Sequence, residues 1–483
     1  MPPQKFGVHQ VLLWAALIAA VLGALEPSAT LLSVAAAFLG FAIVMRDVTR
    51  LRRGALTPMT FFALAFTLTS VANAIGVASL AERGNQSPFD LYVALDYTYF
   101  ACVVMTVGGT AIIAGFYTAE HWRFWRTVGK ALPKIRTRVN DRDLTFGGVV
   151  IALLSLVLTN ALGPNRFGTV SGLIALLPDL AIFTLSRLGA ARGSRRIIIV
   201  ALVLAMAVAA YAALFAYLRS EILLPIFAVL IGLVVGSRSL AVLGRRVLIP
   251  VYLLIALFAV NFATLGRIRS KAGAGESRIA AFRAASTADV SDSTGDAAAI
   301  PVRLSTLNQL SQVGLLVDKE GFLRGSTLEY LGFAFVPRFL WPAKPKIAKG
   351  AWFAYRIGEA LVRPDGTYSN SINMTVPGEL YLNFGWVGVV VGSYLFGVLL
   401  ALFWSTAMFW TDNNNPLGTA FGFYLLWIGV SLVADLQILV TLLAIYLLFL
   451  AGSVVLSGMR RDRRHVRMGL SGADLQATGR PRI

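Results

Sequence analysis

The sequence predicts an all-α polytopic membrane protein with about twelve transmembrane helices and one large, partly helical extracytoplasmic loop. Three observations predict this fold class. Of the 483 residues, 57% are hydrophobic and only 14% are charged, whereas a soluble domain carries about 25% charged residues. Apolar segments of bilayer length recur along the chain. Lysine and arginine gather in alternate connections between those segments.

A bilayer span takes about 20 apolar residues. We expect spans near 10–25, 30–45, 58–80, 93–117, 145–163, 169–187, 197–217, 222–236, 247–265, 377–404, 417–434 and 437–456. The first is short enough to resemble a signal peptide, but the charge alternation downstream fits its retention as a helix. The chain then has four parts: helices one to nine (1–265), a loop segment (266–376), helices ten to twelve (377–456) and a basic tail (457–483).

Positive charge distinguishes the two sides of the membrane. The connections that we place in the cytoplasm contain Arg46, Arg50, Arg52, Arg53, Arg123, Arg126, Lys130, Lys134, Arg136, Arg138, Arg142, Arg187, Arg192, Arg195, Arg196, Arg238, Arg245, Arg246 and the arginines of the tail. The short connections on the other side hold only Arg83, Arg166 and Arg219. Both termini are therefore expected in the cytoplasm and the loop segment outside it. Because the net charge of +19 is spread over these clusters, it indicates contact with anionic membrane lipid and no nucleic-acid partner.

The loop segment divides by composition. Residues 270–299 are rich in Ala, Ser, Asp and Gly, which is typical of mobile or weakly helical chain. From 300 onward leucines and aromatics return, and 304–317 has a helical pattern. The run Ser326-Thr327-Leu328-Glu329 predicts a helix that starts with a capping box.

Two polar stretches of the loop segment are candidates for substrate binding. The run FVPRFLWPAKPK carries Arg338, Trp341 and Lys344, and its three prolines forbid a regular helix. A second stretch contains a Pro-Asp-Gly turn and then hydroxyls and amides, including Asn370 and Asn373. Amide and hydroxyl groups beside aromatic rings suit the mixed polar and C–H faces of a sugar.

Glu379 opens the tenth predicted span, where an unpaired carboxylate is costly. One interpretation is structural: the carboxylate follows Pro377-Gly378 and is stabilised by the helix dipole. The other is functional: it is a general base, or it orients a catalytic arginine.

Arginines near the predicted outer surface form a candidate anion site. Arg219 lies in the turn between spans seven and eight, and Arg267 directly follows span nine. Together with Arg338 and Lys344 they would line a cationic mouth that binds a diphosphate, because guanidinium groups bind phosphate bidentately. The alternative for each arginine is ordinary snorkelling to the interface.

The residue types that the predicted outer face lacks narrow the range of reactions that it could catalyse. The one cysteine, Cys102, lies in an apolar span, and His9, His121 and His465 all fall on the predicted cytoplasmic side. We therefore expect no metal and no cofactor. Outer-face chemistry would depend on carboxylates, cations and hydroxyls, and its substrate would carry a leaving group already.

The topology and three strings resemble the Wzy-type oligosaccharide repeat-unit (O-antigen) polymerases. The strings are Arg-Phe-Leu-Trp-Pro-x-Lys-Pro at Arg338–Pro345, Pro-Gly-Glu-x-Tyr-x-Asn-Phe-Gly at Pro377–Gly385, and GSRS at Gly236–Ser239. The resemblance implies a fold similar to the GT-C glycosyltransferases, in the plasma (inner) membrane of a bacterium. It implies transfer of a growing glycan from one undecaprenyl diphosphate to the sugar end of another lipid-linked repeat unit. A flippase and a chain-length regulator are the protein partners that we expect.

On this hypothesis the site residues have distinct roles. Arg338 handles the anionic substrate, with Lys344 and more weakly Arg219 or Arg267, and Glu379 accepts the proton of the acceptor hydroxyl. Trp341 and Tyr381 stack on sugar rings, and Asn370, Asn373 and Asn383 contact substrate. Three alternatives remain: a lipid-linked oligosaccharide flippase or another transporter, an O-antigen ligase, and a noncatalytic scaffold, which the dense Arg/Trp/Pro/Lys block makes less attractive. The ligases are expected to use an outer-loop histidine, which this sequence lacks.

Overall fold

The computed structural model describes residues 8–50, 56–83, 93–120, 122, 141–162, 169–212, 219–237, 305–333, 341, 343, 349–362, 368, 371–412, 416–430, 436, 438–439, 442–447 and 450–451. These residues are mainly helical, and their only β structure is an isolated antiparallel bridge between Val362 and Tyr368, on either side of the predicted Pro-Asp-Gly turn. The prediction of an all-α protein is confirmed for the described residues. The predicted ninth span, 247–265, lies outside them.

The helices of the first half are α1 (Val8–Leu25), α2 (Ala29–Arg50), α3 (Pro58–Arg83), η2 (Leu95–Tyr97), α4 (Thr98–Glu120), α6 (Asp141–Leu162), α7 (Thr169–Arg192), α8 (Arg195–Tyr211) and α9 (Arg219–Ser237). The second half contains α14 (Leu307–Glu320), η6 (Ser326–Gly332), α15 (Lys349–Arg356), α16 (Val376–Val387), η7 (Gly388–Gly392), α17 (Ser393–Asp412) and α18 (Pro416–Val430). Among the described residues, four stretches are long and apolar enough to cross a membrane: Ala29–Asp47, Pro58–Ala78, Leu95–Glu120 and Val376–Met408. The chain is therefore a helical membrane protein, and the number of twelve spans stays a prediction.

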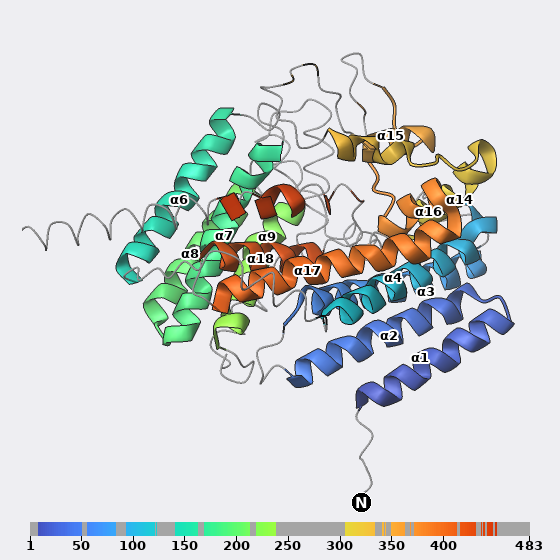
Figure 1. The fold of residues 1–483 in the computed structure, drawn as a ribbon, viewed down its shortest axis with the longest axis horizontal. Coiled ribbons are helices and arrows are strands. Elements are labelled where there is room, and N and C mark those ends of the chain that lie inside the picture. The colour runs from blue at the N-terminus through green and yellow to red at the C-terminus, as the bar shows by residue number, and fades with distance from the viewer. Residues whose placement is uncertain are drawn as a thin grey trace, which may run out of the picture.

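Most of the long helices in the described part of the fold belong to two groups (Figure 1). In the first, α1 to α4 and α17 lie side by side, and glycines allow close approach at their crossings. An added Cβ at Gly115 of α4 would lie 2.0 Å from the Tyr394 carbonyl oxygen, and one at Gly397 of α17 would lie 2.0 Å from that of Ile112. The second group contains α6 to α9, in which Gly232 of α9 lies against the Phe183 carbonyl of α7.

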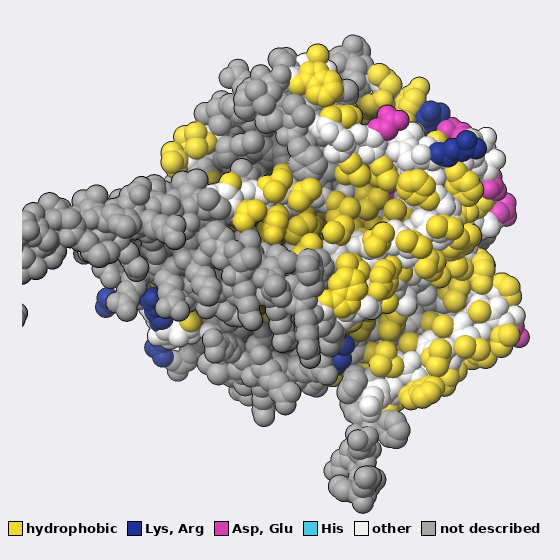
Figure 2. Space-filling view, viewed as in Figure 1, with side chains coloured by type: hydrophobic (Ala, Val, Ile, Leu, Met, Phe, Trp, Pro, Cys, Tyr) yellow, Lys and Arg dark blue, Asp and Glu magenta, His cyan; other side chains and the backbone are white. Residues whose placement is uncertain are grey.

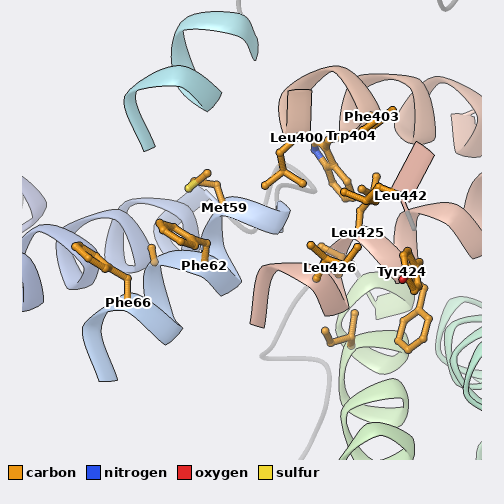
Figure 3. Packing of buried hydrophobic residues seen from close by; sticks show 14 of the residues in the cluster. Met59, Phe62, Phe66, Leu400, Phe403, Trp404, Tyr424, Leu425, Leu426 and Leu442 are labelled. Atoms are coloured by element: carbon orange, nitrogen blue, oxygen red, sulfur yellow. The ribbon is translucent and has the colours of Figure 1, made fainter. Parts of the chain in front are cut away.

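Helix α18 joins the two groups. An added Cβ at Gly429 would lie 2.4 Å from the Pro58 carbonyl oxygen of α3, and the Phe423 ring stacks on Phe183 of α7 with centroids 4.7 Å apart. Figure 3 shows the buried side chains of α3, α17 and α18 that pack in this region. Large apolar side chains also cover the outside of the first group (Figure 2), as expected of helices that face lipid.

The two ends of the first group carry different polar contacts. At one end, Arg46 pairs with the buried Asp47 at 2.9 Å, and Thr60 of α3 donates to the same carboxylate at 2.7 Å. Tyr117 of α4 lies under the Arg46 guanidinium, 4.0 Å from its ring centroid. At the other end, Tyr97 donates to Asp318 of α14.

The separation of these ends matches a bilayer. At about 1.5 Å per residue, the stretch from Tyr97 to Tyr117 is about 30 Å long, which equals the usual hydrocarbon thickness of about 30 Å. The C-terminal ends of α2 and α4, which precede basic stretches of the sequence, therefore lie opposite to α14. This is the arrangement that the predicted topology requires, and the side that each end faces stays a prediction.

The predicted helix within 304–317 is confirmed as α14. Its buried residues Leu307, Leu310, Val313, Leu316 and Val317 recur at helical spacing. The helix packs on η2, α4 and α16, and Val313, Leu316 and Val317 form a small core with Phe353, Met374 and Leu382. Gly314 allows α14 to lie close to η2, since an added Cβ would lie 2.6 Å from the Tyr97 ring.

Asn73 of α3 fixes the start of α14. Its side-chain oxygen accepts from Ser305 Oγ and from the Thr306 backbone N–H, both at 2.9 Å, and its Nδ2 donates to Thr306 Oγ1 at 3.2 Å. All three residues are buried, so loss of any of these hydrogen bonds would leave a polar group that water cannot reach and that has lost its hydrogen-bond partner.

We expect Asn73→Ala to destabilise the protein by about 1–3 kcal/mol, the usual cost of an unsatisfied buried donor. The measurement is the thermal unfolding midpoint, with limited proteolysis of residues 305–333 as a local readout. Thr118→Val is the matched control, because Thr118 is exposed and its hydroxyl donates to the Ala114 carbonyl of its own helix. Equal midpoints for the two variants would contradict a docking role for Asn73.

Candidate functional site

The chain reverses direction at Gly385. This residue has φ 63° and ψ −149°, far from helical values. Beyond it, an added Cβ at Gly388 would lie 2.3 Å from the Leu380 carbonyl oxygen, and one at Gly392 would lie 2.6 Å from the Leu380 side chain. In one straight helix, residues eight apart would be separated by about 12 Å. Residues 376–384 therefore form a half-helix that lies back along η7.

The prediction of one uninterrupted helix over 377–404 is wrong in its first part. Its hydropathy is continuous, since both arms of the reversal are apolar. Hydropathy cannot detect a reversal of this kind, whereas Gly385 adopts the required positive φ at little cost.

The half-helix starts deep in the first group of helices. An added Cβ at Gly108, in the middle of α4, would lie 2.4 Å from Pro377 and 3.4 Å from Ser393 Oγ. At the other end of the half-helix, Tyr381 packs on Phe100 near the start of α4, with centroids 4.6 Å apart. Pro377 and Ser393 thus lie at one level, about 12 Å below the turn at Gly385 by helical rise.

Both ends of the half-helix are capped by the protein. Thr375, at φ 68°, accepts at its side-chain oxygen from the Gly378 N–H at 3.1 Å. At the other end, the N–H groups of Leu323 and Arg324 donate to the carbonyls of Leu382 and Asn383 at 3.0 and 3.1 Å. The loop segment therefore supplies the C-terminal cap.

Glu379 is the centre of a buried polar network. Its side chain is 0% exposed, and Lys349 and Thr327 both donate to Oε1, Thr327 at 2.9 Å. The backbone N–H of Leu436 donates to Oε2 at 2.9 Å. The carboxylate is therefore held by groups from three other segments: the start of α15, η6 and the chain after α18.

Asn383, one turn after Glu379, extends the network. Its Nδ2 donates to Thr327 Oγ1 at 2.7 Å and to the Glu379 carbonyl at 2.8 Å, and its Oδ1 accepts from the Gly325 N–H at 2.9 Å. The amide of Asn383 thus fixes Thr327, which in turn donates to Glu379.

Lys349 is positioned by the packing of α15. Phe353 and Ala354 of this helix are fully buried, and Phe353 belongs to a small core with Val313 and Met374. The Lys349 ammonium lies 3.8 Å from the centroid of the Tyr330 ring. A buried ammonium next to both a carboxylate and an aromatic face is stabilised by each.

Nine of the ten predicted site residues fall into three groups. Arg338, Lys344, Arg267 and Asn370 lie outside the described residues, and Arg219 is described only as the first residue of α9. Glu379 and Asn383 meet in the buried network. Trp341 and Asn373 are exposed, and Trp341 packs edge-to-face on Phe333 at 5.9 Å.

Tyr381 lies in a cluster of protein rings. Its centroid is 5.4 Å from that of Trp386 and 5.7 Å from that of Phe322, in addition to the contact with Phe100. Its role in stacking on a sugar stays a prediction.

Sequence analysis missed Lys349 and Thr327. Lys349 follows the Pro-rich run by three residues and looks like one more basic residue of the loop segment. Thr327 was interpreted as part of a capping box, which is wrong: the N-cap of η6 is Gly325, with no side-chain cap bond. The spacing of Glu379 and Asn383, one helical turn apart, was the only sequence signal of a shared face.

The network offers a cation, a carboxylate, a hydroxyl and an amide where the loop segment meets the spans. Among the described residues, no group of three or more His, Cys, Asp or Glu is placed to hold a metal ion. Comparison with protein-family models, with curated proteins and with solved structures found no match.

Proposed function

We propose that this protein is a membrane glycosyltransferase that polymerises lipid-diphosphate-linked oligosaccharide repeat units on the outer face of a bacterial plasma membrane. One observation carries the proposal. The loop segment reaches into the bundle and contributes Lys349 and Thr327 to a buried site whose carboxylate, Glu379, belongs to the half-helix. A site shared between a loop and the spans is suited to a substrate with a lipid anchor and a polar head.

The proposed reaction transfers the donor glycan from its lipid diphosphate to a hydroxyl group of the acceptor sugar. The hydroxyl of the acceptor sugar attacks the anomeric carbon of the donor, and the bond from that carbon to the diphosphate oxygen breaks. The lipid diphosphate leaves with the bonding electron pair, and the hydroxyl proton passes to a base. Because the donor is already activated, the reaction requires neither a nucleotide nor a second activating step.

Cations of the loop segment would bind the diphosphate. We assign this role to Arg338 and Lys344, with Arg219 or Arg267 as further contacts, since guanidinium groups stabilise charge on a leaving phosphate. Trp341, Asn370 and Asn373 remain the candidates for sugar contacts.

The contacts of Glu379 favour one of its two functional interpretations. Its oxygens accept from Lys349, Thr327 and Leu436, so orientation of a cation is better supported than proton abstraction. We therefore propose Lys349, Thr327 and Asn383 as positioning residues around Glu379, and the cation that Glu379 orients is Lys349.

The test is polymerisation by the purified protein in vesicles, with lipid-linked repeat units isolated from cells that lack the gene. We expect Arg338→Ala to lower the rate at least 100-fold, as for a group that stabilises the leaving charge. Arg356→Ala is the matched control, because this exposed arginine of α15 contacts Glu320 and the Trp352 ring and lies outside the buried network. A full-length glycan ladder from Arg338→Ala would remove this arginine from the mechanism.

A transporter of lipid-linked oligosaccharide is the second candidate. Two structural features favour a transporter: the half-helix and the buried Lys349–Glu379 pair. Transporters bind their substrates through broken helices and intramembrane charges, and the sequence alone provided less support for this function. Against it, the start of the half-helix is already capped by Thr375 and followed by Glu379, so its positive end is compensated. Cells that lack a transporter would retain repeat units on the inner leaflet, whereas cells that lack a polymerase would display single units outside.

A further inference from the structure

The tip of the loop segment, Gly321–Gly325, has a fixed shape. Three of its residues have positive φ: Gly321 at 78°, Arg324 at 49° and Gly325 at 91°. The N–H groups of Leu323, Arg324 and Gly325 all bond to the end of the half-helix. The tip is therefore held at the level of the turn at Gly385, where an added Cβ would lie 3.1 Å from the Phe322 ring.

Three aromatic rings are exposed at this level. Phe322 is 48% exposed, Phe384 is 46% and Trp386 is 44%. They come from two segments, and the tip touches the turn, since an added Cβ at Gly325 would lie 3.4 Å from the Phe384 ring. Soluble proteins rarely expose such rings together, whereas membrane proteins place aromatic rings at the lipid–water boundary.

The surroundings of the rings form a polarity gradient. On the side of the spans, the exposed residues are aliphatic: Val387, Val390, Val391 and Leu395 of α16, η7 and α17. On the other side they are charged: Asp318, Lys319, Glu320 and Arg324. Figure 2 shows charged side chains along one rim of the apolar surface. Aliphatic, aromatic and charged residues follow one another in the order of the hydrocarbon core, the interface and water.

We propose that the tip Gly321–Gly325 is seated in the interfacial layer of the phospholipid bilayer, with Phe322 beside Phe384 and Trp386 among the lipid glycerol groups. The occupant is bilayer lipid, because the rings continue the lipid-facing surface of a candidate membrane span. The tip anchors the loop segment to the membrane next to the buried Lys349–Glu379 pair. This inference does not depend on the enzymatic activity.

The test uses cysteine probes in the full chain. The only cysteine, Cys102, is first replaced by alanine, and single cysteines are introduced as Phe322→Cys and Phe384→Cys. Each is labelled with a small fluorophore after reconstitution in phosphatidylcholine vesicles. Val391→Cys marks the lipid-facing span, and Tyr355→Cys marks an exposed position of α15 in the loop segment.

Two quenchers then report depth. Phosphatidylcholine with a doxyl group near the glycerol end of its acyl chain should quench the 322 and 384 probes at least about twofold more than the 355 probe. Aqueous iodide should quench the 355 probe most. If the 322 probe follows the 355 probe with both quenchers, the tip lies above the bilayer and the proposal fails, whatever the 384 probe does. If Phe322→Cys does not fold, the 384 probe is the test. Stronger quenching of the 384 probe than of the 355 probe by the doxyl lipid then supports the interfacial position, and equal quenching of the two probes overturns the proposal.

Discussion

Replacing Lys349 with methionine is expected to destabilise the protein by about 3–5 kcal/mol, the usual cost of removing one partner of a buried ion pair. The reason is Glu379: it is fully buried, and its negative charge would lose the ammonium that pairs with it, while the hydrogen bonds from Thr327 and Leu436 remain. The measurement is the thermal unfolding midpoint of the protein in detergent, together with its polymerisation activity.

The double variant Lys349→Met/Glu379→Gln separates stability from function. Glutamine keeps an oxygen at this position and methionine fills the volume of lysine, so we expect most of the lost stability to return. Activity should stay low if the charged pair is part of the site. A double variant with both stability and activity restored would show that the pair only holds the fold.

Arg356→Met is the matched control for this experiment. Arg356 lies on the same helix and pairs with Glu320 at 3.0 Å, but both side chains are exposed. Exposed pairs contribute about 0–1 kcal/mol, so its unfolding midpoint should change little. If Lys349→Met unfolds at the same temperature as Arg356→Met, the buried pair does not have the strength that we assign to it.

Gly388→Ala is expected to disrupt the half-helix. Its added methyl group would lie 2.3 Å from the Leu380 carbonyl oxygen, and a backbone atom inside a helix hairpin cannot turn away as a side chain can. Overpacking usually costs about 1–3 kcal/mol, and we expect a value at the upper end or beyond. The readouts are the yield of monodisperse protein after solubilisation and its unfolding midpoint.

Gly147→Ala in α6 is the control for that change. No atom of another described element would lie within 4 Å of the added Cβ, so alanine should be tolerated and gain up to about 1 kcal/mol from its helix propensity. If Gly388→Ala behaves like Gly147→Ala, residues 376–384 do not lie against η7, and the reversal at Gly385 is not present in the protein.

Much of the helical layout was predictable from composition and pattern. The stretches near 30–45, 58–80 and 93–117 correspond to α2, α3 and η2 with α4, because a lipid-facing helix must be apolar over about 20 residues. The stripe within 304–317 likewise predicted α14, since its buried residues recur at helical spacing. Local rules were sufficient here because each element follows from its own residues.

The helix reversal was not predictable from hydropathy, and neither was the network. Gly385 is one of 44 glycines, and nothing nearby in the chain shows that the residues on either side of it pack against each other. Glu379 was recognised as a candidate from its place in an apolar segment, but its partner Lys349 lies 30 residues away in a polar stretch with several other cations.

By itself, the sequence determined that this chain is a helical membrane protein with one long polar loop segment, because the hydrophobic effect acts on each segment separately. Only the tertiary structure decided which residues share a site. The pairing of Lys349 with Glu379, and their contacts with Thr327 and Asn383, depend on α15, η6 and the half-helix meeting at one end of the bundle. Such long-range contacts are set by the packing of whole elements, and no local pattern of residues encodes them.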